Sequence, residues 1–372
     1  MLQQARGLRF TALVQNLPES VPFVGPEAQE RTRGRPFRAR IGANESVFGP
    51  SPKALAAMQQ AAAEAWMYCD PENHDLKVAL AHHHGVRPEN IVVGEGIDGL
   101  LGLTVRLVIE PGDVVVTSLG AYPTFNFHVT GFGGRLVRMP YVKDHEDPDA
   151  LLDAARHEDA RLIYFANPDN PMGSWWNAAD VQCLIDRVSA RTLVILDEAY
   201  ADTAPPEAVP PIDVSNPQVL RFRTFSKAYG LAGLRVGYGI GEAGLIKSFD
   251  KIRNHFGVNR LGQIGALAAL ADQDHLSSVV EQIAEARDRV GAIAAANGLR
   301  ALPSATNFVA IDCGRDGNFA RRVLAELIAR DIFVRMPGVR PLDRCIRVSA
   351  GRPGDLTLFA ELLPEALRAA AA

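Results

Sequence analysis

A lysine in a polar turn is the first candidate for chemistry in this sequence. Lys227 follows Thr224 and Ser226, and Arg235 lies eight residues further on. A lysine amine can attack a carbonyl compound and form a Schiff base with it. Hydroxyls and a guanidinium are the donor types that hold a phosphate, the arginine through two parallel hydrogen bonds. This combination is typical of a pyridoxal phosphate site, although most lysines in a Ser-Lys pair are ordinary exposed turn residues.

A carboxylate thirty residues upstream favours the cofactor interpretation. The apolar run 192–196 ends in Asp197, and Tyr200 follows three residues later. A carboxylate at the end of an apolar strand is costly unless it meets a cation. A protonated pyridine nitrogen is such a cation, and the pairing keeps the ring electron-withdrawing. If neighbouring strands are parallel, Asp197 and Lys227 meet at the carboxyl ends of the strands, where open α/β sheets bind ligands.

Three segments resemble the fold-type I aminotransferases, a family of pyridoxal phosphate enzymes. They read NPDNPMG at 167–173, DEAY at 197–200 and SKAYGLAGLR at 226–235. Their order and spacing are most similar to the histidinol-phosphate aminotransferases, from about Arg40 to Ala370. The resemblance implies pyridoxal 5'-phosphate as the cofactor, with Lys227, Asp197 and Tyr200 as catalytic residues. It also implies an α/β chain of PLP-dependent transferase fold type I, with a large doubly wound mixed sheet domain and a small C-terminal α/β domain.

The same resemblance assigns the phosphate end of the cofactor. Thr224, Ser226 and Arg235 are expected to hold the phosphate from one side. Glycines that open a helix let main-chain N–H groups approach an anion, and the turn at 94–99 precedes an apolar helix. The candidates contributed by this turn are Gly96, Ile97 and Asp98.

Four more side chains are expected around the cofactor ring. Asn170 and Tyr200 are expected to donate hydrogen bonds to its phenolic oxygen. Phe125, third in the run Pro-Thr-Phe, is expected to stack on the pyridine face, with Tyr122 as a core or rim alternative. Tyr68 matches a family tyrosine that reaches the cofactor of the neighbouring subunit, so the resemblance predicts a homodimer with shared active sites.

The expected substrate contacts are two arginines and an asparagine. Arg347 matches the family arginine that binds the substrate α-carboxylate, and Arg335 matches a position that binds the substrate phosphate. Asn44 lies in the run 41–50, which resembles the family loop at the substrate entrance. The sequence departs from the family pattern at Val47, where a proline is usual, and at Met172, where a threonine is usual.

The elements that position these residues alternate along the chain. Apolar runs at 91–93, 113–117, 161–165, 192–196 and 218–222 are separated by helical patterns, which is typical of a doubly wound sheet. The pattern changes near residue 272, where a long helix precedes shorter strands. We therefore expect a large cofactor-binding domain at 41–271 and a small domain at 272–372, preceded by a proline-punctuated arm at 1–40.

Composition narrows the class of protein. A formal net charge of −4 and 22% charged residues give no indication of nucleic-acid or membrane binding. Four scattered cysteines without metal-ligand spacing favour reduced thiols and a cytoplasmic location. Three adjacent histidines at 82–84 point in different directions on a helix, so no metal site is expected. The run GIGEAG at 239–244 matches a dinucleotide motif, but 257–268 lacks the acidic residue that such a site requires.

These observations predict a transamination with small-molecule partners, an amino donor and a 2-oxo acid. Histidinol phosphate is the favoured donor and 2-oxoglutarate the favoured acceptor. Aromatic or other amino acids remain alternative donors. A lyase or decarboxylase on the same fold would keep every cofactor residue, because the cofactor supplies the chemistry and the pocket selects the bond that breaks.

Overall fold

Seven strands form one mixed sheet in the computed structural model, which describes residues 9–19 and 24–372. β8 is antiparallel to both of its neighbours, and the other strands run parallel to one another. The doubly wound mixed sheet predicted from the sequence is therefore confirmed. In spatial order the strands are β2 (Ile91–Gly94), β8 (Gly237–Ile240), β7 (Val219–Thr224), β6 (Leu193–Asp197), β5 (Leu162–Ala166), β3 (Val114–Ser118) and β4 (Arg135–Met139).

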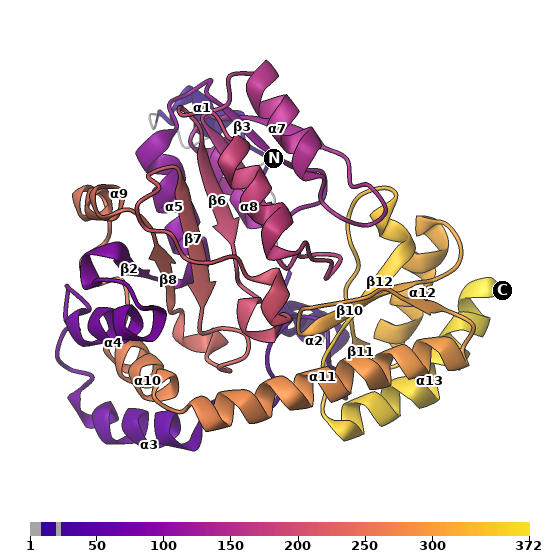
Figure 1. Cartoon of the computed structure of the whole chain (residues 1–372). Helices are drawn as coiled ribbons and strands as arrows, with labels where there is room; N and C mark the ends of the chain where they lie inside the picture. Colours follow the sequence, from indigo (N-terminus) through magenta and orange to yellow (C-terminus); the bar gives the residue numbers. More distant parts are fainter. Residues whose placement is uncertain (1–8, 20–23) are drawn as a thin grey trace.

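Helices cover both faces of this sheet (Figure 1). The central strands alternate their side chains between two apolar cores: Leu162 and Tyr164 of β5 face one core, and Ile163 and Phe165 face the other. The first core is closed by α5 (Gly96–Val108), α6 (Pro123–Gly131) and α9 (Ala243–Ser248), and the second by α7 (Pro148–His157) and α8 (Ala178–Arg187). At the β2–β8 edge, a third core is closed by α4 (His74–His84) and α10 (Arg260–Leu270).

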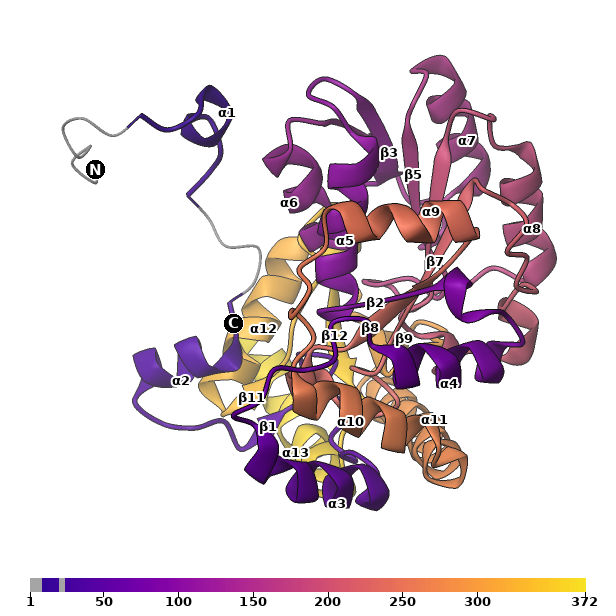
Figure 2. The ribbon, with the colours of Figure 1, turned by 90° about the vertical axis from the view of Figure 1, so that its left-hand side faces the viewer.

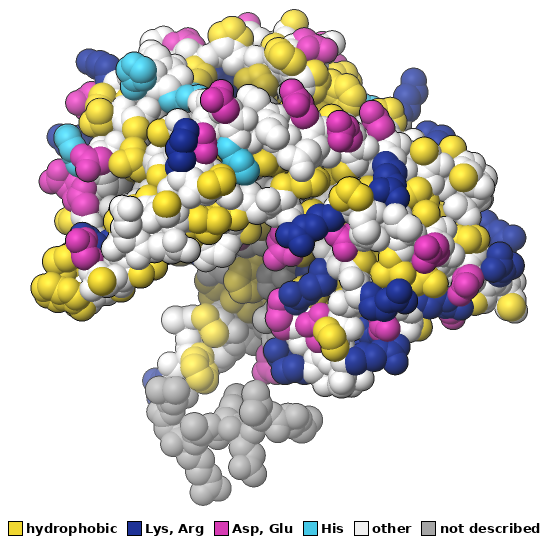
Figure 3. Space-filling view, turned by 90° about the horizontal axis from the view of Figure 1, so that it is seen from below, with side chains coloured by type: hydrophobic (Ala, Val, Ile, Leu, Met, Phe, Trp, Pro, Cys, Tyr) yellow, Lys and Arg dark blue, Asp and Glu magenta, His cyan; other side chains and the backbone are white. Residues whose placement is uncertain are grey.

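A second, smaller sheet lies beside the first (Figure 1). β10 (Phe308–Asp312) is its central strand and pairs antiparallel with β12 (Cys345–Ser349) and β9 (Arg300–Ala301). Its core is packed by the long helix α11 (Gln273–Ala296) with α12 (Gly317–Ala329) and α13 (Pro353–Ala371). Figure 3 shows Lys and Arg side chains interspersed with Asp and Glu over this half of the surface.

The N-terminal segment is tied to the small sheet. β1 (Ala39–Arg40) pairs parallel with β11 (Ile332–Phe333), and Ala39 and Ile41 belong to the small core. α2 (Pro26–Arg33) precedes β1, and α3 (Pro52–Ala61) follows it. α1 (Ala12–Gln15) buries none of its residues, and Figure 2 shows it standing apart from the body.

Short 3₁₀ turns complete the secondary structure. They are η1 (Ala62–Glu64), η2 (Pro88–Asn90), η3 (Ala201–Thr203), η4 (Pro206–Ala208), η5 (Ala232–Leu234), η6 (Phe249–Lys251) and η7 (Leu342–Arg344). Within the described residues, no helix is both long enough and apolar enough to cross a bilayer.

Candidate active site

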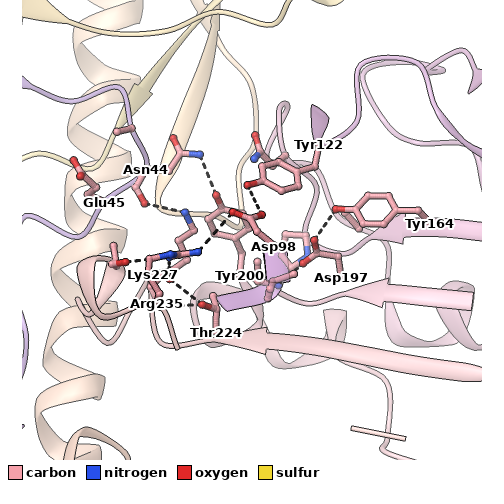
Figure 4. A pocket seen from close by; sticks show the side chains of 18 residues that line it. Asn44, Glu45, Asp98, Tyr122, Tyr164, Asp197, Tyr200, Thr224, Lys227 and Arg235 are labelled. Carbon is pink, nitrogen blue, oxygen red and sulfur yellow. Dashed lines mark hydrogen bonds and ion pairs between the residues drawn. The ribbon is translucent and has the colours of Figure 1, made fainter. Parts of the chain in front are cut away.

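The predicted chemistry converges on one cavity at the carboxyl ends of β5, β6 and β7. Its empty space, which includes the part open to solvent, is about 860 Å³. Figure 4 shows side chains that point into it from the ends of the large sheet, from the start of α5 and from the segment around Asn44. The lining residues are Ala43, Asn44, Glu45, Ile97, Asp98, Tyr122, Tyr164, Ala166, Pro168, Asn170, Asp197, Ala199, Tyr200, Thr224, Ser226, Lys227, Ala232 and Arg235.

Lys227 projects into the cavity from the turn that follows β7. Thr224, the last residue of β7, donates a hydrogen bond from Oγ1 to the Ser226 hydroxyl at 3.0 Å and accepts one from the Ser226 N–H at 3.1 Å. These bonds fix the turn on which Lys227 stands. The Lys227 amine donates to the main-chain carbonyl of Asn44 at 3.3 Å and lies 5.4 Å from the centre of the Tyr200 ring.

Arg235 bridges the two halves of the expected phosphate site. Its Nη1 donates to Ser226 Oγ at 3.3 Å, and its Nη2 lies 3.6 Å from a carboxylate oxygen of Asp98 at the start of α5. Gly96, the first residue of α5, has a φ of +74°, and a Cβ there would clash with Arg235 Nη2. Glycine at 96 therefore allows both the positive φ and the close approach of the guanidinium.

Asp197 closes the cavity at the end of β6. Its carboxylate accepts hydrogen bonds from the Tyr164 hydroxyl at 2.6 Å and from the Ala199 N–H at 2.9 Å. Burial raises the pKa of Asp197 to about 6, although both hydrogen bonds and the charge of Lys227 oppose this shift. Among the described residues, no cationic nitrogen lies within ion-pair distance of this carboxylate. A protonated ring nitrogen would supply the missing positive charge.

Tyr164 was not identified from the sequence as a site residue. It lies in the middle of the fully buried strand β5, and its hydroxyl is the donor to Asp197. A buried tyrosine needs a hydrogen-bond partner for its hydroxyl. That requirement is the signal in the sequence that could have linked Tyr164 with the buried acid.

Asn44 and Tyr200 meet from opposite sides of the cavity. The Asn44 side chain donates from Nδ2 to the Tyr200 hydroxyl oxygen at 3.0 Å. The Tyr200 ring packs edge-on against Phe308, with 5.6 Å between ring centres. The other polar groups of Asn44 are bonded to Ser349, Asn307 and Lys227.

Arg347 lies on β12 and contacts Asn170, which lines the cavity. Its Nη1 donates to Asn170 Oδ1 at 2.5 Å, and its guanidinium lies 4.9 Å from the centre of the Phe308 ring. Burial lowers the pKa of Arg347 to about 10, with the nearby charge of Arg335 adding to that effect and Tyr200 and Asp169 opposing it. Its Nε is buried and lacks a hydrogen-bond partner among the described residues. The site thus contains a charged donor without a full set of acceptors.

Arg335 is paired with Arg347 through main-chain hydrogen bonds. The two residues form an isolated antiparallel bridge, with N–H···O distances of 2.6 and 3.2 Å. Arg335 also donates from Nη2 to the main-chain carbonyl of Val24 at 2.8 Å. The structure therefore brings the two arginines together, although neither lines the cavity described above.

Phe125, which the sequence predicts to stack on the cofactor ring, does not line the cavity in the structure. Its side chain is completely buried and stacks on Tyr164 at 4.4 Å between ring centres. Phe125 and Val129 lie one helical turn apart on α6, so both face the apolar core under the sheet. Tyr122, at the N-cap of α6, lines the cavity instead. Its hydroxyl donates to Asp98 at 2.7 Å, and burial raises the pKa of Tyr122.

Tyr68 also lies outside the cavity of its own chain. Its side chain is 80% exposed and packs on Phe256, with 4.7 Å between ring centres. The neighbouring Trp66 is 82% exposed. Tyr68 therefore does not contribute to the cavity of its own chain in this structure.

The donor set of the cavity fits pyridoxal phosphate. An amine and a buried carboxylate surround one space together with two hydroxyls and a guanidinium, which face the start of α5. They match the aldehyde, the ring nitrogen and the phosphate of that cofactor, respectively.

Comparisons with known proteins agree with this chemistry. The family profile described as aminotransferase class I and II matches residues 40–363. A crystal structure of histidinol-phosphate aminotransferase from Sinorhizobium meliloti in complex with pyridoxal-5'-phosphate is 57% identical in sequence. It superposes with a TM-score of 0.95, over 97% of this chain and 98% of that one.

Two curated relatives have similar names. Histidinol-phosphate aminotransferase 1 of Mesorhizobium japonicum is 37% identical over 337 residues, which cover 88% of this chain and 90% of the relative. The histidinol-phosphate aminotransferase of Moorella thermoacetica is 33% identical over 351 residues, which cover 93% of this chain and 90% of the relative.

Proposed function

Because the chain belongs to the class I and II aminotransferases, we propose that it moves the amino group of histidinol phosphate to 2-oxoglutarate. The enzyme is a pyridoxal phosphate-dependent aminotransferase, as its family implies. The donor is taken from the relatives, which are named for this activity and resemble the chain over nearly its whole length.

The proposed substrates are chosen because two arginines lie next to each other in the structure. Arg335 and Arg347 are bridged through their backbones beside Asn170, and Arg347 keeps a buried Nε without an acceptor. Guanidinium groups bind carboxylates and phosphates through paired hydrogen bonds. Both proposed substrates are anionic, since histidinol phosphate carries a phosphomonoester and 2-oxoglutarate carries two carboxylates. Arg335 is proposed for the phosphate, and Arg347 for the phosphate or the α-carboxylate.

The proton transfers are assigned to Lys227. When bound, pyridoxal phosphate supplies an electron-withdrawing ring that makes the Cα–H bond of the amino donor acidic. With its amine free, Lys227 would take the proton from Cα as a general base and later return a proton as a general acid. The second substrate reverses these steps.

Asp197, Tyr200 and Asn170 are assigned to the ring of the cofactor. Asp197 would pair with the protonated ring nitrogen. The positive charge of that nitrogen would stabilise the ionised carboxylate, which burial disfavours. The Tyr200 oxygen accepts from Asn44, so its own proton can be donated to the phenolic oxygen. Asn170 accepts from Arg347 through Oδ1, which leaves its amide N–H groups as donors. Tyr122 is proposed to contact the ring in place of Phe125.

The phosphate is assigned to the turn after β7 and the start of α5. Thr224, Ser226 and Arg235 would donate from one side. Main-chain N–H groups near Gly96, Ile97 and Asp98 would donate from the other, where the dipole of α5 favours an anion. The Asp98 carboxylate contacts Tyr122 and Arg235, so we propose that it positions these two side chains at the cofactor site.

The active unit is proposed to be a homodimer in the cytoplasm. The exposed Tyr68 and Trp66 support a subunit interface, because large aromatic side chains are enriched in such contacts. All four cysteines are free thiols, which is consistent with a reducing compartment.

A half-reaction screen tests the proposal. The purified enzyme is mixed with histidinol phosphate, histidinol, histidine and aromatic amino acids one at a time, and the absorbance of the bound cofactor is followed. Conversion of the cofactor to its amine form should be most efficient with histidinol phosphate. A preference for an aromatic amino acid would overturn the donor. Release of carbon dioxide or an elimination product, without sustained transfer to 2-oxoglutarate, would indicate a decarboxylase or lyase instead.

A further inference from the structure

Asn44 is a buried residue in a left-handed backbone conformation, with a φ of 57°. Asparagine tolerates this conformation better than most residues. Its main-chain N–H donates to the Ser349 hydroxyl at 3.1 Å, and its Oδ1 accepts from the same hydroxyl at 3.3 Å. Its main-chain carbonyl accepts from Asn307 Nδ2 at 3.0 Å. Ser349, the last residue of β12, and Asn307, the residue before β10, therefore hold both the backbone and the side chain of Asn44.

The remaining bonds of Asn44 go to the two reactive side chains of the cavity. Its carbonyl also accepts from the Lys227 amine at 3.3 Å, and its Nδ2 donates to the Tyr200 hydroxyl at 3.0 Å. A carbonyl oxygen has two lone pairs, and both of those on Asn44 are used. Since all four of its polar groups bond to protein atoms, Asn44 is better suited to hold its neighbours than to bind substrate.

One of the residues that hold Asn44 lies on the strand that also carries a proposed substrate arginine. Ser349 ends β12 and pairs in register with Phe308, the residue after Asn307. The Ser349 N–H donates to the carbonyl of Ile41 at 2.8 Å, and the Ala350 N–H donates to that of Asn307 at 2.8 Å. Arg347 lies two residues before Ser349, so their side chains leave the strand on the same face. One rigid strand thus connects the anion-binding wall with Asn44.

We propose that Asn44 is a positioning residue for Lys227 and Tyr200, and that Ser349 and Asn307 hold it in place. The small sheet thereby determines where the reactive amine rests when it is not joined to the cofactor. This inference rests on the proposed function in one respect, the assignment of Lys227 as the reactive amine. It replaces the expectation that Asn44 contacts the substrate.

The first test uses the cofactor-free protein, so that it needs neither substrate nor turnover. A limiting amount of acetic anhydride labels the amines, and mass spectrometry compares Lys227 with the exposed Lys143 in the same molecule. In Ser349→Ala the Lys227 amine is no longer held against the Asn44 carbonyl. Its labelling relative to Lys143 should rise by about three- to fivefold, the scale expected for one lost hydrogen bond. Asn307→Leu should have the same effect through the other anchor.

Two further variants separate positioning from general damage. Ser349→Thr keeps the hydroxyl and should restore the wild-type ratio. Ser304→Ala removes a hydroxyl that bonds to the Phe308 carbonyl in the same segment as Asn307, without contact to Asn44, and should leave the ratio unchanged. Circular dichroism and thermal melting confirm that each variant is folded before it is labelled.

The holoenzyme supplies a second readout. Ser349→Ala should lower kcat several-fold while the KM for 2-oxoglutarate stays within about twofold, because the substrate arginines are untouched. The inference is overturned if folded Ser349→Ala and Asn307→Leu label Lys227 at the wild-type ratio, or if Ser304→Ala changes it as much as they do. A wrong amino donor would leave the labelling result unchanged, so failure of the substrate proposal is seen separately in the half-reaction screen.

Discussion

At the scale of single residues, ionisation of the buried Asp197 carboxyl should lower the stability of the folded protein. Without a bound cation, the pKa of Asp197 is about 6, above its ordinary value of 3.8. The folded protein therefore keeps a proton that the unfolded chain releases between these values. It follows that Asp197 reduces stability as the pH rises through this window, with the full reduction above pH 6.

Asp197→Asn should stabilise the cofactor-free protein in a pH-dependent manner. The gain in the free energy of unfolding should approach about 3 kcal/mol at pH 8, since one pKa unit corresponds to about 1.4 kcal/mol. At pH 4.5 it should be much smaller, because the wild-type carboxyl is then mostly protonated. Urea unfolding at both pH values measures the gain. An effect of equal size at the two pH values would show that charge is not its cause.

The same substitution should have the opposite effect on function. With cofactor bound, Asp197→Asn should lower the turnover rate by several orders of magnitude, because an amide cannot stabilise a protonated ring nitrogen. Single-turnover kinetics at saturating cofactor measure this effect. Near-normal turnover in the cofactor-loaded variant would contradict an electronic role for Asp197.

Arg335 is the residue proposed to bind the phosphate of the amino donor. If Arg335 binds the phosphate, Arg335→Gln should weaken histidinol phosphate binding by roughly 1.5–3 kcal/mol, the scale of a hydrogen bond to a charged group. Histidinol, which lacks the phosphate, should lose little. Titrations of the cofactor absorbance with each donor measure the difference. Arg340→Gln, at an exposed arginine in the loop before β12, is the matched control. An equal loss for both donors would assign Arg335 a structural role only.

At the scale of elements, phosphate binding depends on how closely the start of α5 approaches the turn after β7. Gly96→Ala places a methyl group against the Arg235 guanidinium at a positive φ. The resulting shift of Arg235 should weaken cofactor binding about tenfold, because the loss of one hydrogen bond to a charged group costs about 1.5 kcal/mol. Equilibrium dialysis of the cofactor measures this change.

A second glycine gives the control for that experiment. Gly233 lies in η5, two residues before Arg235, and a Cβ there would meet no other atom within 4 Å. Gly233→Ala should therefore bind the cofactor as the wild type does. Equal weakening in the two variants would mean that added bulk near Arg235, rather than the approach at Gly96, is responsible.

The division of the chain at residues 41 and 272 remains a proposal. Asp272 lies between α10 and α11, and its carboxylate accepts from Ser51 at 2.5 Å and from Lys53 at 2.6 Å. On the other side, β1 ends at Arg40 and is paired with β11 of the small unit. The segment at 41–45 therefore crosses from the small unit to the cavity, which is the position from which Asn44 contacts both.

At the scale of the whole molecule, the proposed dimer makes a prediction about complementation. Lys227→Ala subunits lack the amine, and Tyr68→Phe subunits lack the hydroxyl proposed to act in the partner's site. After subunit exchange, a mixed dimer has one site that carries both mutations and one that carries neither. Activity should therefore rise above that of either parent, as measured in a coupled assay for glutamate. Proven exchange without any gain would argue against shared sites.

The sequence by itself was sufficient for the cofactor and for the residues closest to its reactive end. Twelve residues of sequence contain Thr224, Ser226, Lys227 and Arg235, and Asp197 ends an apolar run. Short-range spacing and the high cost of a buried charge were therefore enough to predict them. The mixed sheet was predictable for a similar reason, because alternation of apolar runs and helical patterns is a local property of the chain.

Only the tertiary structure decided which groups surround those residues. The helical register of α6 turned Phe125 into the core and left Tyr122 in the cavity. Asn44 meets Tyr200 across 156 residues of sequence and Ser349 across 305. The bridge between Arg335 and Arg347 depends on how the segment before β12 folds back. Such contacts arise from the packing of two sheets against one segment, and packing between distant parts of a chain leaves no periodic pattern in the sequence from which it could be predicted.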